Sequence, residues 1–359
     1  RIRPANRARR GHLRDDYPMD LSVYGSPTQV LAIEEASQIG HARRSAQKLA
    51  LQHGFNENDG GRVALVVTEL ASNLLKHAGH GELHLRLLPH PDGTGIEVLA
   101  VDRAAGFDRA TCMTDGYSSG GTQGIGLGAA ARQADAFDLY TDERGTVLLA
   151  RFYRDGGLGK RKRDMRYGLS QHSLHNDPAC GDSWYLAFRG QRLAALVLDG
   201  LGHGVEAEEA ALAGRDAFAR EPFAAADRLI ADMHEAMSRT RGAAVGIAQF
   251  DAASDSLQFA GIGNIAASLV SAEKTRGLSS HPGIVGAQYR KTQTFDYAAV
   301  NGNLLILHSD GLQSRWNLRD YPGLVHCHPA VIAAVLQRDF SRGRDDVTVL
   351  VVALETVDD

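Results

Sequence analysis

Apolar residues in the first half of the chain recur at two spacings, which predict different secondary structures. Over 31–53 and again over 60–77 they fall three or four residues apart, which places them on one face of a helix. Over 82–88 and 95–102 apolar and polar residues alternate, as they do in a strand with one buried face. The sequence therefore predicts two amphipathic helices followed by two strands.

The pattern continues into a hairpin. A short helix is expected at 129–134, and alternating segments at 137–141 and 146–152 flank the turn sequence DERG at 142–145. Two helices packed on one antiparallel or mixed sheet form a layered α+β architecture. We therefore expect an α+β fold for this half of the chain.

A stretch without periodic apolar residues then divides the chain. Residues 154–166 contain three glycines and the basic run KRKR, so we expect an exposed linker, with a functional basic patch as the alternative. Beyond it the pattern is strand-rich, and strands do not alternate strictly with helices, which disfavours a parallel doubly wound sheet. The expected strands are 183–188, 192–198, 243–250, 257–261, 266–270, 303–308 and 346–354, and the expected helices are 204–220, 222–238 and 329–340.

Composition and charge fit a division into two domains. The 359 residues are 43% hydrophobic and 23% charged, as in a globular protein, and a typical domain has about 150 residues. The formal net charge of −4 is distributed as −1 over 1–153, +4 over 154–166 and −7 over 167–359. Because the basic excess lies in the expected linker and not on a folded face, we expect no nucleic-acid partner.

Three further features bear on location. No apolar stretch approaches the roughly 20 residues that span a bilayer, so we expect no membrane segment. Cys112, Cys180 and Cys327 are far apart in the sequence, which favours a reducing, cytoplasmic compartment. Residues 1–26 are rich in arginine and lack the apolar region of a secretory signal. We expect a flexible basic tail with Met19 as the native start, and a basic arm for an acidic partner is the alternative.

Polar residues mark one stripe of the second expected helix. In RVALVVTELASNLLKH at 62–77, Glu69, Asn73 and His77 are spaced four residues apart and share a face. An amide oxygen such as that of Asn73 suits Mg²⁺, and a carboxylate such as that of Glu69 can accept a proton. An ordinary polar helix face is the alternative, so this assignment depends on motifs later in the chain.

Two later motifs complete a candidate nucleotide site. Asp102 ends an expected buried strand and is followed by the sequence RAAG, which ends at Gly106. The segment GGTQGIGLG then places Gly124, Gly126 and Gly128 before a helix, where a glycine backbone can approach phosphates.

In this order, over about residues 27–153, these motifs resemble the GHKL ATP-binding superfamily. The similarity is greatest to the serine kinases and anti-sigma kinases of bacterial partner-switching pathways. It implies a Bergerat α/β two-layer sandwich that binds ATP and Mg²⁺. One departure is visible, since Ala104 replaces the first glycine of the usual Asp-x-Gly-x-Gly. By this resemblance Asn73 would hold Mg²⁺, Glu69 would act as base toward the substrate hydroxyl, Asp102 would accept the adenine amino group, and Gly106, Gly124, Gly126 and Gly128 would line the nucleotide.

In the second half of the chain, carboxylates stand at four expected strand ends, and three of them lie beside a glycine. They are Asp182, Asp199, Asp310 and Asp345. Oxygen ligands suit Mg²⁺ or Mn²⁺, and a neighbouring glycine leaves room for water bound to the metal. Each Asp-Gly pair alone is a common turn sequence. The coincidence of all four in this order indicates a divalent-metal site.

This set, over about residues 167–354, resembles the metal-dependent PPM-type serine/threonine phosphatases, in their bacterial sporulation and stress-response branch. The resemblance implies an α/β/β/α sandwich in which water activated by two Mn²⁺ or Mg²⁺ ions attacks phosphorus. By it Asp199 would bridge the two metals and the Gly200 carbonyl would bind one, Asp310 and Asp345 would complete the shell of the other, Asp182 would lie in or next to the coordination shell, and Asp346 would lie outside it.

Two residues near this set have alternative roles. His203 is either a general acid toward the leaving serine oxygen or a loop residue with a structural role. Cys180 is expected to be a buried packing residue, because the implied mechanism needs no cysteine nucleophile.

Two opposed sets of site residues in one chain predict a bifunctional regulator of a bacterial partner-switching pathway. It would combine an ATP-dependent Ser/Thr kinase with Glu69 as base and a metal-dependent phosphatase with Asp199 and Asp310 at its centre. By the resemblance the substrate would be a STAS-type anti-sigma antagonist. The alternatives are an N-terminal domain that senses nucleotide or gates the phosphatase without transferring phosphate, and one that binds a sigma factor directly.

Overall fold

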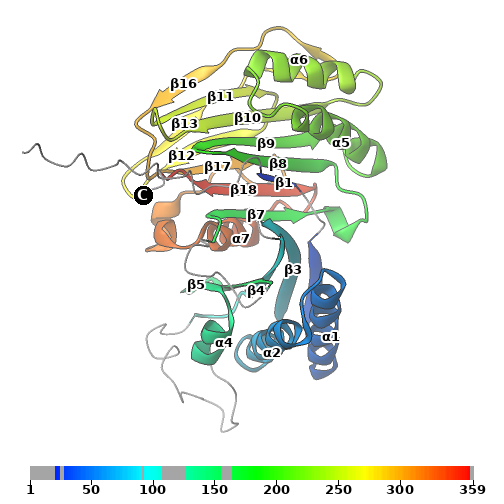
Figure 1. Ribbon diagram of the computed structural model, residues 1–359, viewed down its shortest axis with the longest axis vertical. Helices are drawn as coiled ribbons and strands as arrows, with labels where there is room; N and C mark the ends of the chain where they lie inside the picture. The colour runs from blue at the N-terminus through cyan, green and yellow to red at the C-terminus, as the bar shows by residue number, and fades with distance from the viewer. Residues whose placement is uncertain (1–20, 25–27, 91–92, 107–126, 155–163, 356–359) are drawn as a thin grey trace, which may run out of the picture.

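The N-terminal half is a two-layer domain. The computed structural model describes residues 21–24, 28–90, 93–106, 127–154 and 164–355 (Figure 1). One layer is an antiparallel sheet with the strand order β2-β3-β4-β6-β5. Its strands are β2 (Gln29–Ile33), β3 (Gly81–His90), β4 (Gly93–Val101), β5 (Ala136–Asp142) and β6 (Gly145–Tyr153). Helices α1 (Ala36–Gln52), α2 (Glu57–Asn73) and α4 (Leu127–Gln133) pack on one face of this sheet.

The first helix begins later than the periodicity predicts. Leu31 and Ile33 are buried and alternate with exposed Ala32, so this stretch is strand β2, and the prediction of a helix from residue 31 is wrong there. The helix begins after Glu35, which forms a capping box with Gln38. The local capping signal therefore sets the boundary.

The C-terminal half contains two sheets packed face to face. One has the order β1-β8-β9-β10-β11-β16, and the other has the order β13-β12-β17-β18-β7. The strands are β1 (Leu21–Tyr24), β7 (Tyr167–His172), β8 (Asp182–Arg189), β9 (Arg192–Gly200), β10 (Ala243–Asp251), β11 (Ser256–Ile262), β12 (Ala266–Val270), β13 (Thr275–Leu278), β16 (Phe295–Ala298), β17 (Leu304–His308) and β18 (Val347–Ala353). A small hairpin of β14 (Gly283–Ile284) and β15 (Gln288–Tyr289) lies beside them.

Helices cover the outer faces of this sandwich. Helices α5 (Val205–Ala219) and α6 (Ala226–Ala236) pack on the first sheet, and α7 (Pro329–Phe340) packs on the second (Figure 1). The order of layers is therefore helix, sheet, sheet, helix. Together with the two-layer N-terminal domain, this confirms the predicted fold class.

Helix α7 belongs to both halves of the molecule. Its residues from Pro329 to Leu336 are all buried. One side contacts β7 and β18, and the other contacts β4, β5 and β6 of the N-terminal sheet. Leu99, Val147 and Leu149 of that sheet share one hydrophobic cluster with the helix. The N-terminal sheet is thus covered by its own helices on one face and by α7 on the other, which ties the two domains into one packed body.

The extreme N-terminal segment corrects one prediction. Residues 21–24, expected to be part of the flexible basic tail, form strand β1, which pairs antiparallel with β8 of the C-terminal domain. Val23 is fully buried, and the Tyr24 ring stacks on Tyr185 at a centroid distance of 5.5 Å. Strand β1 therefore belongs to the C-terminal sheet, although it precedes the whole N-terminal domain in the sequence. Residues 1–20 and 25–27 lie outside the described residues.

Buried charges join the domains where the linker was expected. The guanidinium of Arg151 is fully buried and donates to Glu97 at 2.7 Å and to Asp164 at 3.0 Å. Asp164 also accepts from His328 of the segment before α7, at 2.9 Å. Although burial acts to raise it, the charge of Arg151 and the hydrogen bond from His328 hold the pKa of Asp164 well below its usual range. Although residues 154–166 were expected to be an exposed linker, Asp164 is only 13% exposed and is packed into the interface.

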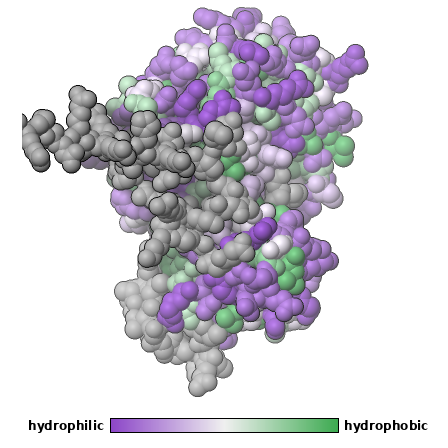
Figure 2. All heavy atoms as spheres, in the orientation of Figure 1, coloured by the Kyte–Doolittle hydropathy of each residue, from purple (hydrophilic) through white to green (hydrophobic). Residues whose placement is uncertain are grey.

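On the face shown in Figure 2, the coloured residues are mostly hydrophilic, with scattered apolar spots. Over the described part of the chain, the exposed large apolar side chains are Tyr24, Leu51, Leu201 and Val205. Isolated exposure of this kind is normal for a globular protein. Within the same residues, no helix is long and apolar enough to cross a membrane.

Candidate functional site

The predicted metal carboxylates gather where strands of the two C-terminal sheets end. Asp182 at the start of β8 lies directly opposite Asp199 near the end of β9 in the antiparallel register. Asp182 is buried, and its Oδ2 accepts a hydrogen bond of 2.6 Å from Ser309 Oγ, at the end of β17 in the other sheet. Ser309 Oγ in turn accepts from the backbone N–H of Thr348 at 3.0 Å. The contact therefore fixes one sheet against the other beside the site.

Burial and neighbouring carboxylates raise the pKa of Asp199. Burial raises the pKa of Asp199 to about 7, and the negative charges of Asp310 and Asp345 add to the shift. The pKa of Asp345 is also raised, first by burial and then by Asp310 and Asp346. Asp310 Oδ2 accepts a hydrogen bond of 2.8 Å from Asn264 Nδ2. Such a set is costly without a nearby cation, because like charges close together in a low-dielectric site repel.

The chemistry of this donor set fits Mg²⁺ or Mn²⁺. Every candidate donor is an oxygen, from a carboxylate or from the Gly200 carbonyl. Within the described residues no group of three His, Cys, Asp or Glu side chains is placed to hold one ion as it stands. Ligation here would therefore combine one or two carboxylates with backbone oxygen and water, which is how Mg²⁺ is commonly held.

Glycine next to these carboxylates has a packing reason. A Cβ on Gly200 would collide with the carbonyl oxygen of Ala207 in α5, and one on Gly311 would collide with the carbonyl oxygen of Asp346. The sequence suggested that these glycines leave room for water bound to a metal. The structure adds a steric reason for glycine at both positions. Close approach of backbones holds Asp199 and Asp310 in place.

Three neighbouring residues occupy supporting positions. Asp346 accepts backbone N–H groups of Leu174 and Gly181, each at 2.6 Å, and thereby anchors the loop that leads to Asp182. Burial raises the pKa of the Cys180 thiol, which keeps it protonated and unreactive. His203 is exposed in the loop between β9 and α5.

The predicted nucleotide site lies in the N-terminal domain. Glu69 and Asn73 are half-buried in the last turns of α2, four residues apart. After Asn73 the helix widens into a π-helical turn, Leu74–Ala78, so His77 leaves the stripe expected from regular helical spacing. π-Helical turns are frequent at functional sites.

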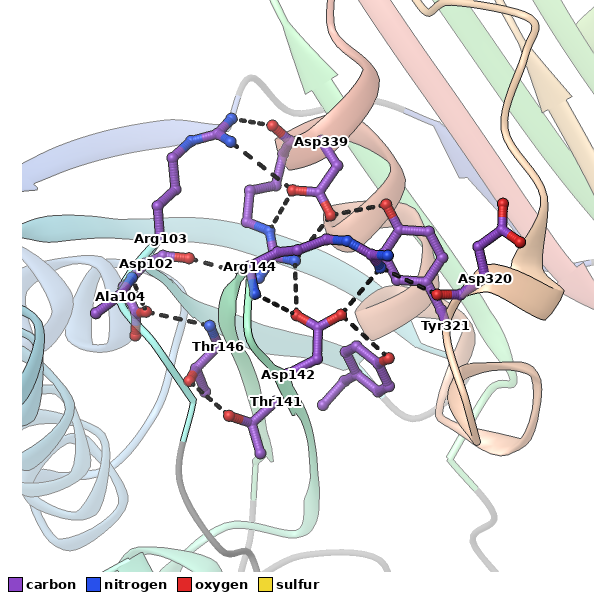
Figure 3. Close-up of polar contacts among 12 residues, drawn as sticks. Asp102, Arg103, Ala104, Thr141, Asp142, Arg144, Thr146, Asp320, Tyr321 and Asp339 are labelled. Atoms are coloured by element: carbon purple, nitrogen blue, oxygen red, sulfur yellow. Dashed lines mark hydrogen bonds and ion pairs between the residues drawn. The ribbon is translucent and has the colours of Figure 1, made fainter.

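Asp102 stands just beyond β4 and is oriented by the backbone around it (Figure 3). Its Oδ1 accepts the N–H groups of Ala104 at 3.0 Å and Thr146 at 3.1 Å. Both of these hydrogen bonds are made to Oδ1, so Oδ2 can accept a hydrogen bond from a ligand. Burial raises the pKa of this carboxyl. A half-buried, oriented carboxylate suits recognition of an amino group.

The glycines of the nucleotide motif divide into two groups. Gly106 donates its N–H to the carbonyl of Asp142 at 2.9 Å, and a Cβ there would collide with that carbonyl and with Thr141 Oγ1. Gly128 is buried in the first turn of α4. Gly124 and Gly126 lie outside the described residues.

Sequence reasoning missed several supporting residues. Ser309, Asn264 and Thr146 hold site carboxylates, but each contact joins segments far apart in the chain, so local spacing gives no signal for it. The buried Arg338, which reaches the carbonyl of Asp102 from α7, was also missed. A charged residue within the apolar pattern of 329–340 was the one signal that could have found it.

Comparisons with known proteins agree with both resemblances. Residues 33–152 match the family model of the histidine kinase-like ATPase domain, and residues 189–355 match that of stage II sporulation protein E. The chain is 31% identical to the serine/threonine-protein kinase RsbT of Bacillus subtilis over 27% of this chain and 74% of the kinase.

The second half is similar to a phosphatase. The chain is 28% identical to the phosphoserine phosphatase RsbX of Bacillus subtilis over 37% of this chain and 67% of that protein. A crystal structure of RsbX in complex with magnesium aligns with a TM-score of 0.46 and 23% identity, over 51% of this chain and 92% of that structure.

Proposed function

The chain belongs to the histidine kinase-like ATPase family in its N-terminal domain and to the SpoIIE family of PPM phosphatases in its C-terminal domain, and on that premise we propose a bifunctional switch. The C-terminal domain is a serine/threonine phosphatase domain, and the N-terminal domain is of the RsbT type. We propose that the first removes phosphate from a protein serine or threonine and the second transfers it from ATP. The observation that supports this proposal is that a domain of the RsbT type and a phosphatase domain are packed together in one chain.

In the phosphatase we propose that Asp199, Asp310, Asp345 and the Gly200 carbonyl hold two divalent cations. When bound, the cations supply activated water and stabilise charge on the phosphoryl group. We propose that Asp182, whose Oδ2 accepts a hydrogen bond from Ser309, lies in or next to the coordination shell, and that Asp346 lies outside it and fixes the loop before Asp182. Hydrolysis breaks the bond between phosphorus and the serine oxygen, forms one to the water oxygen and returns a proton to serine.

In the kinase we propose that Asn73 holds Mg²⁺, that Asp102 Oδ2 accepts the adenine amino group, and that Glu69 takes the proton of the substrate hydroxyl. The hydroxyl oxygen then bonds to the γ-phosphorus, and ADP leaves. Gly106 and Gly128, with Gly124 and Gly126 outside the described residues, would line the nucleotide. Ala104 leaves this arrangement intact, because only its backbone N–H contacts Asp102.

The proposed substrate is a STAS-type antagonist of a bacterial partner-switching pathway, because the relatives are a serine/threonine-protein kinase and a phosphoserine phosphatase, which add and remove the same group. The two described cysteines are free, which fits the cytoplasmic location that we propose. A nucleotide sensor without transfer is the second candidate, since α7 contacts the Asp102 loop and the phosphatase sheet together. A sigma factor bound directly by the N-terminal domain is the third.

The test uses the full chain and a STAS-domain protein captured with it from the native cell. The proposal predicts transfer of phosphate from ATP, lost in Asp102→Asn, and removal of phosphate stimulated by Mn²⁺, lost in Asp310→Asn. The exposed Asp232→Asn in α6 is the matched control and keeps both activities. Nucleotide binding without transfer would favour the sensor, and removal that persists in Asp310→Asn would contradict the metal assignment.

A further inference from the structure

The carboxyl end of α7 meets the loop that carries Asp102. Arg338 is buried, with its side chain 1% exposed, and its Nη1 lies 3.5 Å from the carbonyl oxygen of Asp102. Its Nη2 lies 3.7 Å from Asp142 Oδ1, at the end of β5. Asp339 accepts from the same guanidinium at 2.7 and 2.8 Å. A helix of the phosphatase domain therefore holds its arginine against the proposed nucleotide loop.

A second arginine reaches back from the nucleotide loop. Arg103, next to Asp102, donates to the carbonyl oxygen of Arg338 and lies 3.8 Å from Asp339 (Figure 3). The Tyr321 hydroxyl donates to Asp339 at 3.0 Å. The two segments thus exchange contacts in both directions. Because the guanidiniums alternate with carboxylates, displacement of one group disturbs the charge balance of the others.

The same end of α7 leads directly to the phosphatase carboxylates. Two backbone hydrogen bonds of 2.9 Å join the end of α7 and the residues after it to the loop after β17. Gln313 N–H donates to the carbonyl of Phe340, and Arg342 N–H donates to that of Gly311. Gly311 follows Asp310 in the sequence, and Asp345 lies on the segment that begins with Arg342. Covalent chain and backbone hydrogen bonds therefore connect Arg338 to two proposed metal ligands.

The packing leaves this end of the helix little freedom. The backbone of Gly145 lies so close that a Cβ there would come within 2.8 Å of Arg338 Nη1 and would collide with the carbonyl of Asp102. The body of α7 is buried between the two domains. A tightly packed contact transmits a displacement because its neighbours have no void to absorb it.

We infer that the carboxyl end of α7 couples occupancy of the nucleotide site at Asp102 to the Asp310 and Asp345 segment of the phosphatase, with Arg338 and Arg103 as positioning residues. The inference rests on the proposed nucleotide site. An adenine nucleotide that orders the Asp102 loop also orders the segment 340–346, and by linkage the phosphatase site acts back on nucleotide affinity by the same factor.

Hydrogen–deuterium exchange of the full chain tests this coupling without measuring activity. The chain is compared with and without adenosine 5′-(β,γ-imido)triphosphate, with equal Mg²⁺ in both samples. The expected result is slower exchange around Ala104 and Thr146, which contact Asp102, and exchange at least about fivefold slower at Gln313 and Arg342. Slowing at the Asp102 loop with none at Gln313 and Arg342 overturns the coupling and leaves the nucleotide site standing. No slowing at either place overturns the nucleotide site itself.

Variants separate the route through α7 from general stiffening. In Arg103→Ala, whose side chain is 64% exposed, and in Arg338→Met, the nucleotide still slows exchange at the Asp102 loop but no longer at Arg342. The matched control Arg228→Ala removes an exposed, ion-paired arginine of α6 and keeps both effects. If Arg338→Met fails to fold, the result for Arg103→Ala alone decides whether the coupling passes through α7. If the nucleotide still slows exchange at Arg342 in each of these two variants that folds, the coupling does not pass through α7 and the inference is overturned.

Discussion

The two candidate sites are built in different ways. In the phosphatase domain, Asp182 and Asp199 face each other across paired strands, and Ser309 and Asp346 fasten them to the second sheet and its loops. In the kinase-type domain, Asn73 is at the end of α2, and Asp102 lies in a loop held by short local hydrogen bonds and by α7. Strand pairing sets how Asp182 and Asp199 face each other, whereas the relative placement of Asn73 and Asp102 depends on hydrogen bonds from other segments.

The largest effect is expected from Asp199→Asn. Removal of a carboxylate from the centre of the proposed metal site should lower phosphatase turnover by about 10³-fold or more, because stabilisation of the phosphoryl transition state is lost. Phosphate transfer by the other domain should be unchanged. Turnover on a phosphoserine peptide with Mn²⁺ measures the effect, and a loss below about tenfold would show that Asp199 is not central.

Arg151→Met tests whether the two regions share one folded body. The variant leaves the buried carboxylates of Glu97 and Asp164 without their common cation, so the free energy of unfolding should fall by about 3–5 kcal/mol. Urea unfolding measures it. Arg166→Met, which breaks an exposed ion pair with Glu355, is the control and should cost about 1 kcal/mol or less. Equal effects in the two variants would contradict a charged core between the domains.

Asn73→Ala tests the proposed site in the kinase-type domain. Loss of a proposed Mg²⁺ ligand should reduce phosphate transfer by about 10–100-fold and leave the phosphatase unchanged. Asn58→Ala, an exposed asparagine in the first turn of the same helix, is the matched control. Transfer that is unaffected by Asn73→Ala would rule out the proposed base and metal arrangement on α2.

The smallest effect is expected at strand β1. Tyr24→Ala removes a ring stacked on Tyr185 and should lower the free energy of unfolding by about 1 kcal/mol. Leu51→Ala, another exposed apolar side chain, controls for loss of surface area. Thermal unfolding of the full chain measures both variants, and equal stability of Tyr24→Ala and wild type would mean that the ring stack contributes nothing.

Sequence patterns predicted what is local. The strand ends with Asp182, Asp199 and Asp310 lie where apolar alternation and glycine placed them. The helical spacing of the apolar residues after Ile33 was extended too far back, because Leu31 and Ile33 are two residues apart and follow the strand period.

Long-range packing was beyond the sequence. The run VIAAVL in α7 is apolar all round, which indicates burial but not that its two sides face different domains. Asp164 lies in a basic, glycine-rich stretch, yet Arg151 and His328 draw it into the interface. Arg338 reaches Asp102 and Asp142 from the far end of the sequence, so no local pattern contains either contact.

The central claim, that one chain carries two opposed activities, is tested most directly by following phosphate on the captured STAS-domain protein by mass spectrometry. The Asp199→Asn chain with ATP should accumulate the phosphorylated protein. The Asn73→Ala chain with Mn²⁺ should convert phosphorylated protein to the free form. Accumulation in the first and clearance in the second is the predicted result, and a protein that is never phosphorylated by the Asp199→Asn chain would contradict it.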